Sequence, residues 1–439
     1  MADTLNKLAS AMLVQSVAAG TAAADGRRSR SLCEHRGMNL IEITALSWSP
    51  DPPRADQPLV IEVLVSVDAR IIFEVDLVLE LFAADGQRVF VRSAHQDGAD
   101  ARWLPTGHYR WRLTAPEGSL PVAAGRLLAT VLYRDGPHAR RSNTAELAVV
   151  DAAVGSGLQH ARCTLDGDPD PAQLSWRRGH EDWFFRHFDH AAPTAGSYLL
   201  KDSELLRGHI LDVGCGDGIT DLGMFLRYQP QRLVGVDPFR GYHRLAEVAA
   251  AEHLPLDPWP EGLEFCDADA NHLPFADDSF DVVVSWGSVE HIAGGYLQAL
   301  REMKRVLRPD GLLFIHPGLF YSNPGSHLGE FSDEPFFHLK QSREQLRDFI
   351  LSTPPRRMDR AGHVASNAEY WQWFTELNPI TVAGFEQELR ALEFEPWRVA
   401  IRTEGIIEYT PELLRYPMQD LATAELYLSC WNRKRARPE

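Results

Sequence analysis

The sequence is poor in the features that mark disulfide-rich, metal-bound or membrane proteins. It has five cysteines in 439 residues, an odd number without CxxC spacing, so we expect neither a disulfide framework nor a zinc cluster. No apolar run reaches the length of a membrane-spanning helix. Lysine and arginine number 44 against 61 aspartates and glutamates, and the net charge of −17 argues against a nucleic-acid partner.

The length predicts more than one folded unit. A chain of 439 residues with 44% hydrophobic residues is long enough for two or three domains. Residues 1–37 are rich in alanine, serine and arginine and lack a hydrophobic period, so we expect a flexible N-terminal segment. The folded part is expected to begin near residue 38.

A glycine-rich turn at residues 210–218 is the most informative motif. Its sequence, Ile-Leu-Asp-Val-Gly-Cys-Gly-Asp-Gly, predicts a buried strand and a turn, and residues 219–228 predict a helix. Such a strand–turn–helix unit binds nucleotide-like ligands. A dinucleotide fingerprint would place its third glycine at Ile219. The GxGxG spacing found here therefore argues against a dehydrogenase.

Alternating strands and helices follow this turn, as in an open α/β sheet. The second strand, 232–236, ends at Asp237, and an acid at that point can accept both hydroxyls of a ribose. Further strands are predicted at 280–285, 312–316, 397–402 and 424–431, and a helix at 296–307.

These pieces resemble a known family. The segments DVGCGDG, VGVD, DADANHLPFADDSFDVVVS, EHI and LREMKRVLRPDGLLFI are similar, in order and spacing, to the core of class I S-adenosylmethionine-dependent methyltransferases. The resemblance is strongest over residues 208–317 and extends over about 173–431. It implies a Rossmann-like fold with a mostly parallel seven-stranded sheet, S-adenosyl-L-methionine as cofactor and a cytoplasmic enzyme.

The resemblance also assigns roles to residues. Gly214, Gly216 and Gly218 form the turn that lets the backbone approach the methionine part of the cofactor, and Asp212 holds its amino group. Asp237 binds the ribose hydroxyls. Further cofactor contacts are implied for four residues: Asp269, Ala270, Ser285 and Trp286. Asp267 competes with Asp269 for the adenine amino group.

An oxygen acceptor needs a general base near the cofactor methyl group. His291 follows the fourth strand and His316 ends the fifth, so both are candidate catalytic residues, with Glu290 as a further candidate. His327, like the other histidines of the C-terminal part, is too dispersed along the sequence to argue for a site. We expect no catalytic metal.

Residues 38–150 have a different pattern. Short alternating strands separated by turns such as Asp85-Gly86 predict an antiparallel β-sandwich. The segment resembles the polysaccharide-recognising domain of O-antigen ABC transporter ATPases, for example in Phe82-Ala83-Ala84-Asp85-Gly86-Gln87-Arg88-Val89-Phe90 and Leu104-Pro105-Thr106-Gly107-His108-Tyr109. Its aromatic residues Trp103, Tyr109 and Trp111 either stack on sugars or fill the core. Residues 151–172 are expected to be a linker to the methyltransferase domain at 173–439.

An insertion at about 352–380 separates the fifth and sixth strands. Its aromatic cluster, Tyr370-Trp371-Gln372-Trp373-Phe374, either stacks on an acceptor ring or forms the core of a helical cap.

The sequence favours an O-methyltransferase that acts on a sugar in surface polysaccharide or glycolipid assembly. The alternatives are methylation of a lipid, quinone or secondary metabolite, and a glycan-binding protein with an inactive methylase core. The expected partner is a small-molecule or glycan acceptor, with no nucleic acid and no membrane span. The acceptor atom and the oligomeric state stay open.

Overall fold

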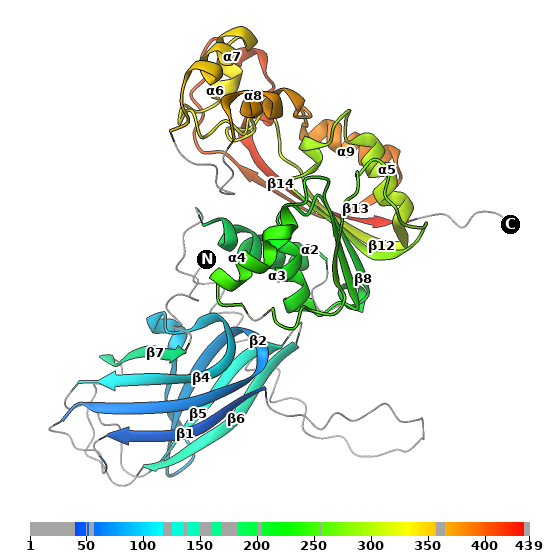
Figure 1. Ribbon diagram of the computed structural model, residues 1–439. Helices are drawn as coiled ribbons and strands as arrows, with labels where there is room; N and C mark the ends of the chain where they lie inside the picture. Colours follow the sequence, from blue (N-terminus) through cyan, green and yellow to red (C-terminus); the bar gives the residue numbers. More distant parts are fainter. Residues whose placement is uncertain are drawn as a thin grey trace. The chain divides into compact units, whose positions relative to one another are not determined.

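The computed structural model describes residues 40–49, 51, 57–116, 125–135, 138–149, 160–168, 182–199, 204–254, 256–356 and 365–433. These residues belong to one compact unit, 39–439, which contains two separate sheets (Figure 1). The expected flexible segment at 1–37 lies outside the described residues.

The N-terminal strands are antiparallel, as the alternating pattern predicts, and they pair into one seven-stranded sheet, whereas the pattern was expected to give a β-sandwich. Its strands are β1 Ile41–Ser49, β2 Leu59–Ala83, β3 Arg88–Ser93, β4 Ala101–Ala115, β5 Gly125–Asp135, β6 His138–Val149 and β7 Arg162–Asp168. They follow the order β6-β5-β2-β4-β7, and β1 and β3 also pair with β2. The strands expected at 59–65 and 73–82 are one strand, β2, whose register against β4 shifts between Val67 and Ile71. Its first part pairs with β1, and its second part pairs with β3 and β5.

The aromatic residues of β4 fill the core of this sheet. Trp103, Tyr109 and Trp111 are all buried. The Trp111 indole N–H donates to the Ala99 carbonyl at 2.7 Å, and the Tyr109 hydroxyl donates to the Pro105 carbonyl at 2.9 Å. Buried polar tips satisfied by backbone are typical of core residues. The alternative that these three rings stack on sugars is therefore wrong for this structure.

Part of the expected linker is a strand. Residues 162–168 form β7 and pair with β4 from His108↔Asp168 to Thr114↔Arg162. The aspartates and glycine that suggested a linker lie at the end of this edge strand, where turn-forming residues are tolerated.

The second sheet is the mostly parallel one that the glycine turn and its sequel predict. Its strands are β8 His209–Val213, β9 Arg232–Val236, β10 Leu263–Cys266, β11 Phe280–Trp286, β12 Leu307–His316, β13 Phe394–Thr403 and β14 Thr423–Asn432. The order is β10-β9-β8-β11-β12-β14-β13, with β14 antiparallel to both neighbours. β12 starts earlier than expected, at Leu307, because it includes the expected turn 308–311 as an irregularity in its pairing with β11.

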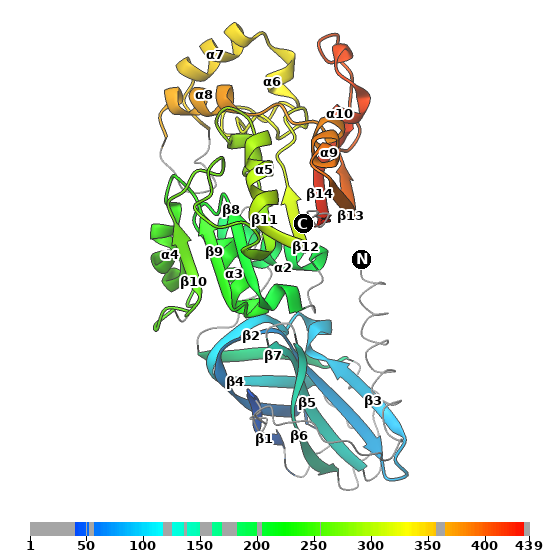
Figure 2. The ribbon, with the colours of Figure 1, turned by 90° about the vertical axis from the view of Figure 1, so that its right-hand side faces the viewer.

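Helices cover both faces of this sheet (Figure 2). These helices are α2 Ala192–Tyr198, which continues the π-helix Phe185–Ala191, and then α3 Ile219–Tyr228, α4 Leu245–Ala251, α5 Leu297–Val306 and α9 Val382–Ala391. Four further helices pack in two smaller hydrophobic clusters: α6 Phe337–Lys340, α7 Arg343–Ser352, α8 Asn367–Glu376 and α10 Met418–Ala422. Successive strand residues point to opposite faces, so Ile210 packs with α2 to α4 and Leu211 packs with α5 and α9. None of the helices in the described ranges is long and apolar enough to cross a membrane.

The order of the strands creates a switch point beside β8. The chain proceeds from β8 outward through β9 and β10, and then returns to β11 on the other side of β8. The loops after β8 and β11 therefore diverge, and such a divergence leaves a crevice at the carboxyl ends of the strands where ligands bind.

Candidate active site

The three glycines after β8 have left-handed backbones but different surroundings. Their φ angles are +82°, +55° and +74° at Gly214, Gly216 and Gly218. A Cβ at Gly214 would lie 2.3 Å from the Ser288 side chain, and one at Gly218 would lie 2.6 Å from the Phe265 ring. A Cβ at Gly216 would meet nothing within 4 Å. Gly214 and Gly218 are thus required by packing, whereas Gly216 presents open backbone to a ligand.

A buried pair of carboxyl groups lies beneath this turn. Asp212, at the end of β8, and Asp221, in the first turn of α3, are both buried. Burial raises the pKa of Asp212 to about 7, although a hydrogen bond with Asp221 opposes the rise, and burial and the Asp212 charge raise the pKa of Asp221 well above its usual range. Asp212 Oδ1 and both Asp221 oxygens accept no hydrogen bond from any other described group. Two buried carboxyl groups in contact are stable if they share a proton. They are also stable if a cationic ligand donates hydrogen bonds to them.

Asp221 was not identified from the sequence. The signal was present, because an acid in the otherwise apolar start of a helix after a glycine turn is unusual. Only the packing of α3 against β8 shows that this acid faces Asp212.

Asp237 is held rigidly at the end of β9. Its Oδ2 accepts from the Gly216 backbone N–H at 3.0 Å, and its Oδ1 accepts from the Phe239 N–H at 2.7 Å. The carboxylate therefore links the second strand to the open glycine. Each oxygen retains a second lone pair, which can accept from a hydroxyl.

Asp267 and Asp269, the two candidate acceptors for the adenine amino group, have different partners. Asp267 pairs with Arg240. Within the described residues, the Asp269 side chain accepts one hydrogen bond shorter than 3.5 Å, from the Asn271 N–H at 2.9 Å, and its carboxylate is exposed. Of the two, Asp269 is the one whose charge is not neutralised by an arginine. Ala270, beside it, packs on the second face of the sheet.

Ser285 and Trp286 at the end of β11 do not line an open cavity together. Ser285 has no exposed surface, and its hydroxyl donates to the Val213 carbonyl at 2.9 Å. It fixes β11 to β8 instead of presenting its side chain to a ligand. Trp286 stacks on His316 with ring centroids 4.4 Å apart and an interplanar angle of 6°.

His316 is enclosed by aromatic rings. Besides Trp286, the Tyr427 ring lies 4.6 Å from its centroid. Burial lowers the pKa of His316 to about 4, so the imidazole is neutral at physiological pH. Neither ring nitrogen has a hydrogen-bond partner within the described part of the chain.

His291 belongs to a cluster that the sequence did not suggest. It follows Glu290 in a short 3₁₀ turn, Val289–His291, and the two rings of His291 and His327 meet edge to face at 4.7 Å. Each histidine places Nε2 3.9 Å from Glu290 Oε1. No pattern in the sequence groups His327 with these residues, and the loop after β12 brings it close to Glu290 and His291.

The insertion after β12 has its own small core. Buried side chains of this cluster include Phe331, Leu346, Ile350 and Tyr370, which come from the loop after β12, α7 and α8. Both helices begin with a capping box, at Ser342 and at Ser366. Tyr370 therefore fills the core of a helical cap, as one of the two interpretations expected, whereas Trp373 remains 37% exposed.

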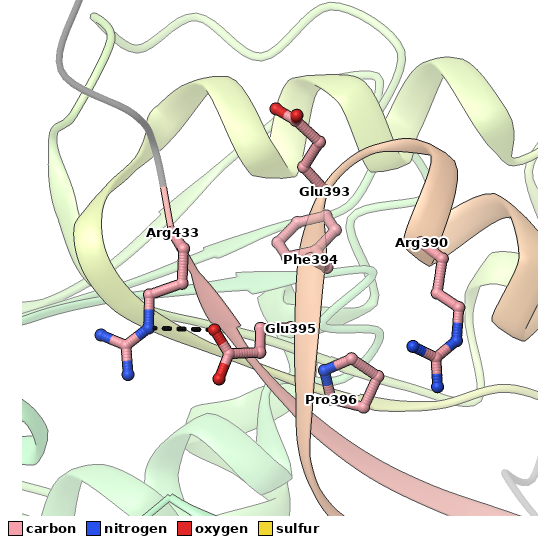
Figure 3. Close-up of a pocket in the computed structure, with 6 residues that line it drawn as sticks. All are labelled: Arg390, Glu393, Phe394, Glu395, Pro396 and Arg433. Atoms are coloured by element: carbon pink, nitrogen blue, oxygen red, sulfur yellow. Dashed lines mark ion pairs between the residues drawn. The ribbon is translucent and has the colours of Figure 1, made fainter.

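A separate hollow lies at the start of β13 (Figure 3). It is lined by Arg390, Glu393, Phe394, Glu395, Pro396 and Arg433, and Arg433 pairs with Glu395 at 3.4 Å. β13 runs parallel to β12, so its first residues lie at the amino ends of the parallel strands. The hollow is thus at the opposite end of the parallel strands from the glycine turn.

Comparison with known proteins agrees with this geometry. Residues 211–315 match the family described as methyltransferase domain. In the structure the matched residues run from β8 to β12, the parallel part of the second sheet, so this part of the chain is similar to methyltransferase domains.

Named relatives match the same region. The 2-methyl-6-phytyl-1,4-hydroquinone methyltransferase 2 of Oryza sativa is 32% identical over 156 residues, or 32% of this chain and 42% of that protein. A phthiotriol/phenolphthiotriol dimycocerosates methyltransferase of Mycobacterium ulcerans is 34% identical over 110 residues, or 25% and 37%. The uncharacterized methyltransferase YcgJ of Bacillus subtilis is 34% identical over 159 residues, or 35% and 56%.

The chain spans about half or less of the length of these relatives. The crystal structure of YcgJ superposes with a TM-score of 0.32 at 18% identity, covering 54% of this chain and 95% of that one. With so low a score, the fold assignment rests on the strand order itself.

Proposed function

We propose that this chain transfers a methyl group from S-adenosylmethionine to an acceptor bound at the carboxyl edge of its parallel sheet. The observation that carries the proposal is the set of groups at the switch point: open backbone at Gly216, the fixed carboxylate of Asp237 and the unpartnered oxygen of Asp212. These groups match an adenosine ribose on one side and an ammonium group on the other.

The residues present fit this cofactor. Asp212 and Asp221 have acceptor oxygens without donors, which the amino group of a methionine can supply. Asp237 would accept from the ribose hydroxyls, and Asp269 with the Ala270 backbone would contact the adenine. When bound, the cofactor supplies an electrophilic methyl group on a sulfonium, and the protein chiefly contributes alignment.

For the acceptor, the exposed His291 is our proposed general base in preference to His316. His316 is enclosed between the Trp286 and Tyr427 rings, whereas the His291 side chain is 39% exposed. A base must reach the acceptor hydroxyl through open space. A variant His291→Ala is expected to lower turnover by roughly 10²–10⁴.

We propose a sugar hydroxyl as the acceptor, in surface polysaccharide or glycolipid assembly and in the cytoplasm. The support is the resemblance of residues 38–150 to a polysaccharide-recognising domain and the antiparallel sheet found there. The burial of Trp103, Tyr109 and Trp111 moves any glycan contact to other side chains of that sheet. The second candidate is a quinol or lipid acceptor, because two of the relatives are named for such acceptors.

Two measurements test these proposals in turn. Calorimetric titration of the full chain with S-adenosylmethionine should show binding. If no binding is seen, the remaining alternative is a glycan-binding protein with an inactive methylase core. Transfer of labelled methyl is then compared across glycan extracts of the host, quinols and lipid extracts. Label in the quinol or lipid fractions alone would reject the sugar.

A further inference from the structure

Three side chains that can ligate a metal converge from the loops that follow β11 and β12. Glu290 and His291 belong to the 3₁₀ turn after β11, and His327 belongs to the loop after β12. Their ligand atoms all lie within 4.8 Å of one another. Both histidines place Nε2 at 3.9 Å from the same carboxylate oxygen, which is too long for a hydrogen bond. The three groups therefore lie close together without a hydrogen bond between either histidine and the carboxylate.

The Glu290 carboxylate is the strongest sign that something is bound there. Its side chain is 4% exposed, and Oε2 is buried without a partner among the described residues. Room for the carboxylate is built into the fold, because a Cβ at Gly318 would lie 2.4 Å from Glu290 Oε1. The backbone around it is also fixed, since the Glu290 carbonyl accepts from the Asn378 N–H at 2.7 Å and Asn378 Nδ2 donates to the carbonyls of Val289 and Ile292. A carboxylate buried without a donor or cation is costly.

We propose that Glu290, His291 and His327 bind a divalent first-row transition-metal cation that positions the acceptor hydroxyl. Two imidazole nitrogens and one carboxylate oxygen form a donor set for such ions, whereas Mg²⁺ prefers oxygen ligands. At metal–ligand distances of about 2.1 Å, tetrahedral ligands lie roughly 3.4 Å apart. The two histidine–carboxylate gaps of 3.9 Å, and the separation of at most 4.8 Å between the histidines, would have to close by side-chain rotation when the cation binds. This proposal replaces our expectation that the protein has no catalytic metal.

Three protein ligands leave coordination positions for an acceptor. A hydroxyl bound there has a lowered pKa, as metal-bound water does. Its oxygen then forms the bond to the methyl carbon, the carbon–sulfur bond breaks with its electron pair on sulfur, and the hydroxyl proton leaves to solvent. This step rests on the proposed methyl transfer, but the cation site stands independently of it. In this arrangement His291 is a ligand and not the general base.

Metal titration of the full chain, purified without a polyhistidine tag and freed of metal with a chelator, tests the site directly. Co²⁺ is the probe, because its visible absorption reports nitrogen ligands, and Zn²⁺ and Mg²⁺ are compared by calorimetry. We expect one Co²⁺ or Zn²⁺ per chain and much weaker Mg²⁺ binding. Glu290→Gln and His327→Gln should each weaken Co²⁺ binding by about tenfold or more.

A matched control is available in the N-terminal sheet. His95 pairs with Asp100 at 2.9 Å, so His95→Gln removes a histidine beside an acid without touching the proposed site. It should leave Co²⁺ binding unchanged. Equal Co²⁺ binding by the wild type, Glu290→Gln and His327→Gln would overturn the proposal. Far-ultraviolet circular dichroism of each variant separates lost binding from lost folding.

The cofactor titration separates this proposal from the proposed function. Metal-free protein should still bind S-adenosylmethionine, because Asp212, Gly216 and Asp237 are not metal ligands. Binding of Co²⁺ without cofactor binding would reject the methyltransferase function and keep the cation site. If the wild type keeps full turnover in the presence of chelator while His291→Ala loses it, the cation site is rejected. His291 is then the general base.

Discussion

The two sheets of this protein treat buried polar groups differently. In the N-terminal sheet, the indole of Trp111 and the hydroxyl of Tyr109 donate to backbone carbonyls, and Asp76 accepts from Ser93 and His95. At the carboxyl edge of the parallel sheet, oxygens of Asp212, Asp221 and Glu290 lack partners among the described residues.

This difference separates a packed core from a ligand site. Burying a polar group without a hydrogen bond costs free energy, so such groups are kept where a ligand completes them. A few unpartnered atoms also occur elsewhere, such as Asp100 Oδ1 in the N-terminal sheet. The distinguishing feature at the carboxyl edge is that Asp212 and Asp221 lie against each other, and that Glu290 lies beside two histidines.

The largest expected effect tests whether the two regions are as separate as the sequence suggests. Phe188 is fully buried, stacks on Phe184 at 4.8 Å, and meets the rings of Trp103 and Phe73 from the N-terminal sheet at 5.9 and 6.2 Å. Phe188→Ala should lower the free energy of unfolding by about 3–5 kcal/mol, because it leaves a cavity.

Calorimetry of this variant shows which region depends on Phe188. If residues 38–150 and 173–439 unfold independently, as we predict from the sequence, two transitions appear and only the second shifts strongly. A single transition that moves as a whole would make the two regions one cooperative unit. Phe239→Ala is the matched control, since that ring is 85% exposed.

A smaller effect, on cofactor affinity, is expected from Asp237 beside the glycine turn. Asp237→Ala removes a charge-assisted acceptor worth roughly 1.5–3 kcal/mol, so the dissociation constant for S-adenosylmethionine should rise about ten- to a hundredfold. Isothermal titration measures this rise. Asp267→Ala is the control, because Asp267 already pairs with Arg240 and should contribute little. Unchanged affinity in Asp237→Ala would remove this carboxylate from the proposed site.

The carboxyl pair predicts a pH dependence of stability. Burial raises the pKa of both Asp212 and Asp221 in the folded state, so this pair holds more protons in the folded protein than in the unfolded chain above about pH 4. The contribution of the pair to stability is therefore fully present below about pH 4 and is lost as the pH rises through about 7. Asp221→Asn keeps the shape without the charge, so its stability relative to the wild type should increase by about 1–3 kcal/mol between pH 5 and 8.

Urea denaturation at the two pH values measures this difference. Saturating S-adenosylmethionine should reduce it, because an ammonium group would stabilise the charged pair. A constant difference between the variant and the wild type across this range would mean that the two carboxyls do not share a proton.

The smallest effect concerns the helical cap. Trp373 on α8 is partly exposed, so Trp373→Ala should change the free energy of unfolding by no more than about 1 kcal/mol and leave cofactor affinity unchanged. If the ring stacks on the acceptor, the KM for that acceptor rises while turnover at saturation is preserved. An unchanged KM would mean that the exposed face of α8 does not bind the acceptor.

Much of the parallel sheet could be predicted because its signals are local. The GxGxG turn fixes positive φ angles, and helix α3 and strand β9 have the bounds that the apolar pattern predicts. Strand β7 was missed because its aspartates and glycine resemble a linker, and only pairing with β4 makes it a strand. The role of Ser285 was also beyond the sequence, since its burial depends on how β11 meets β8.

The sequence by itself determined the class of the fold, the glycine turn and the acids at the strand ends, because backbone preference and strand order follow from neighbouring residues. Only the tertiary structure decided which side chains meet. It placed Asp221 against Asp212 and brought His327 to Glu290 and His291 across the length of β12. Proximity between residues far apart in the chain depends on strand register and on the return of loops to one edge of the sheet, and no local pattern contains that information.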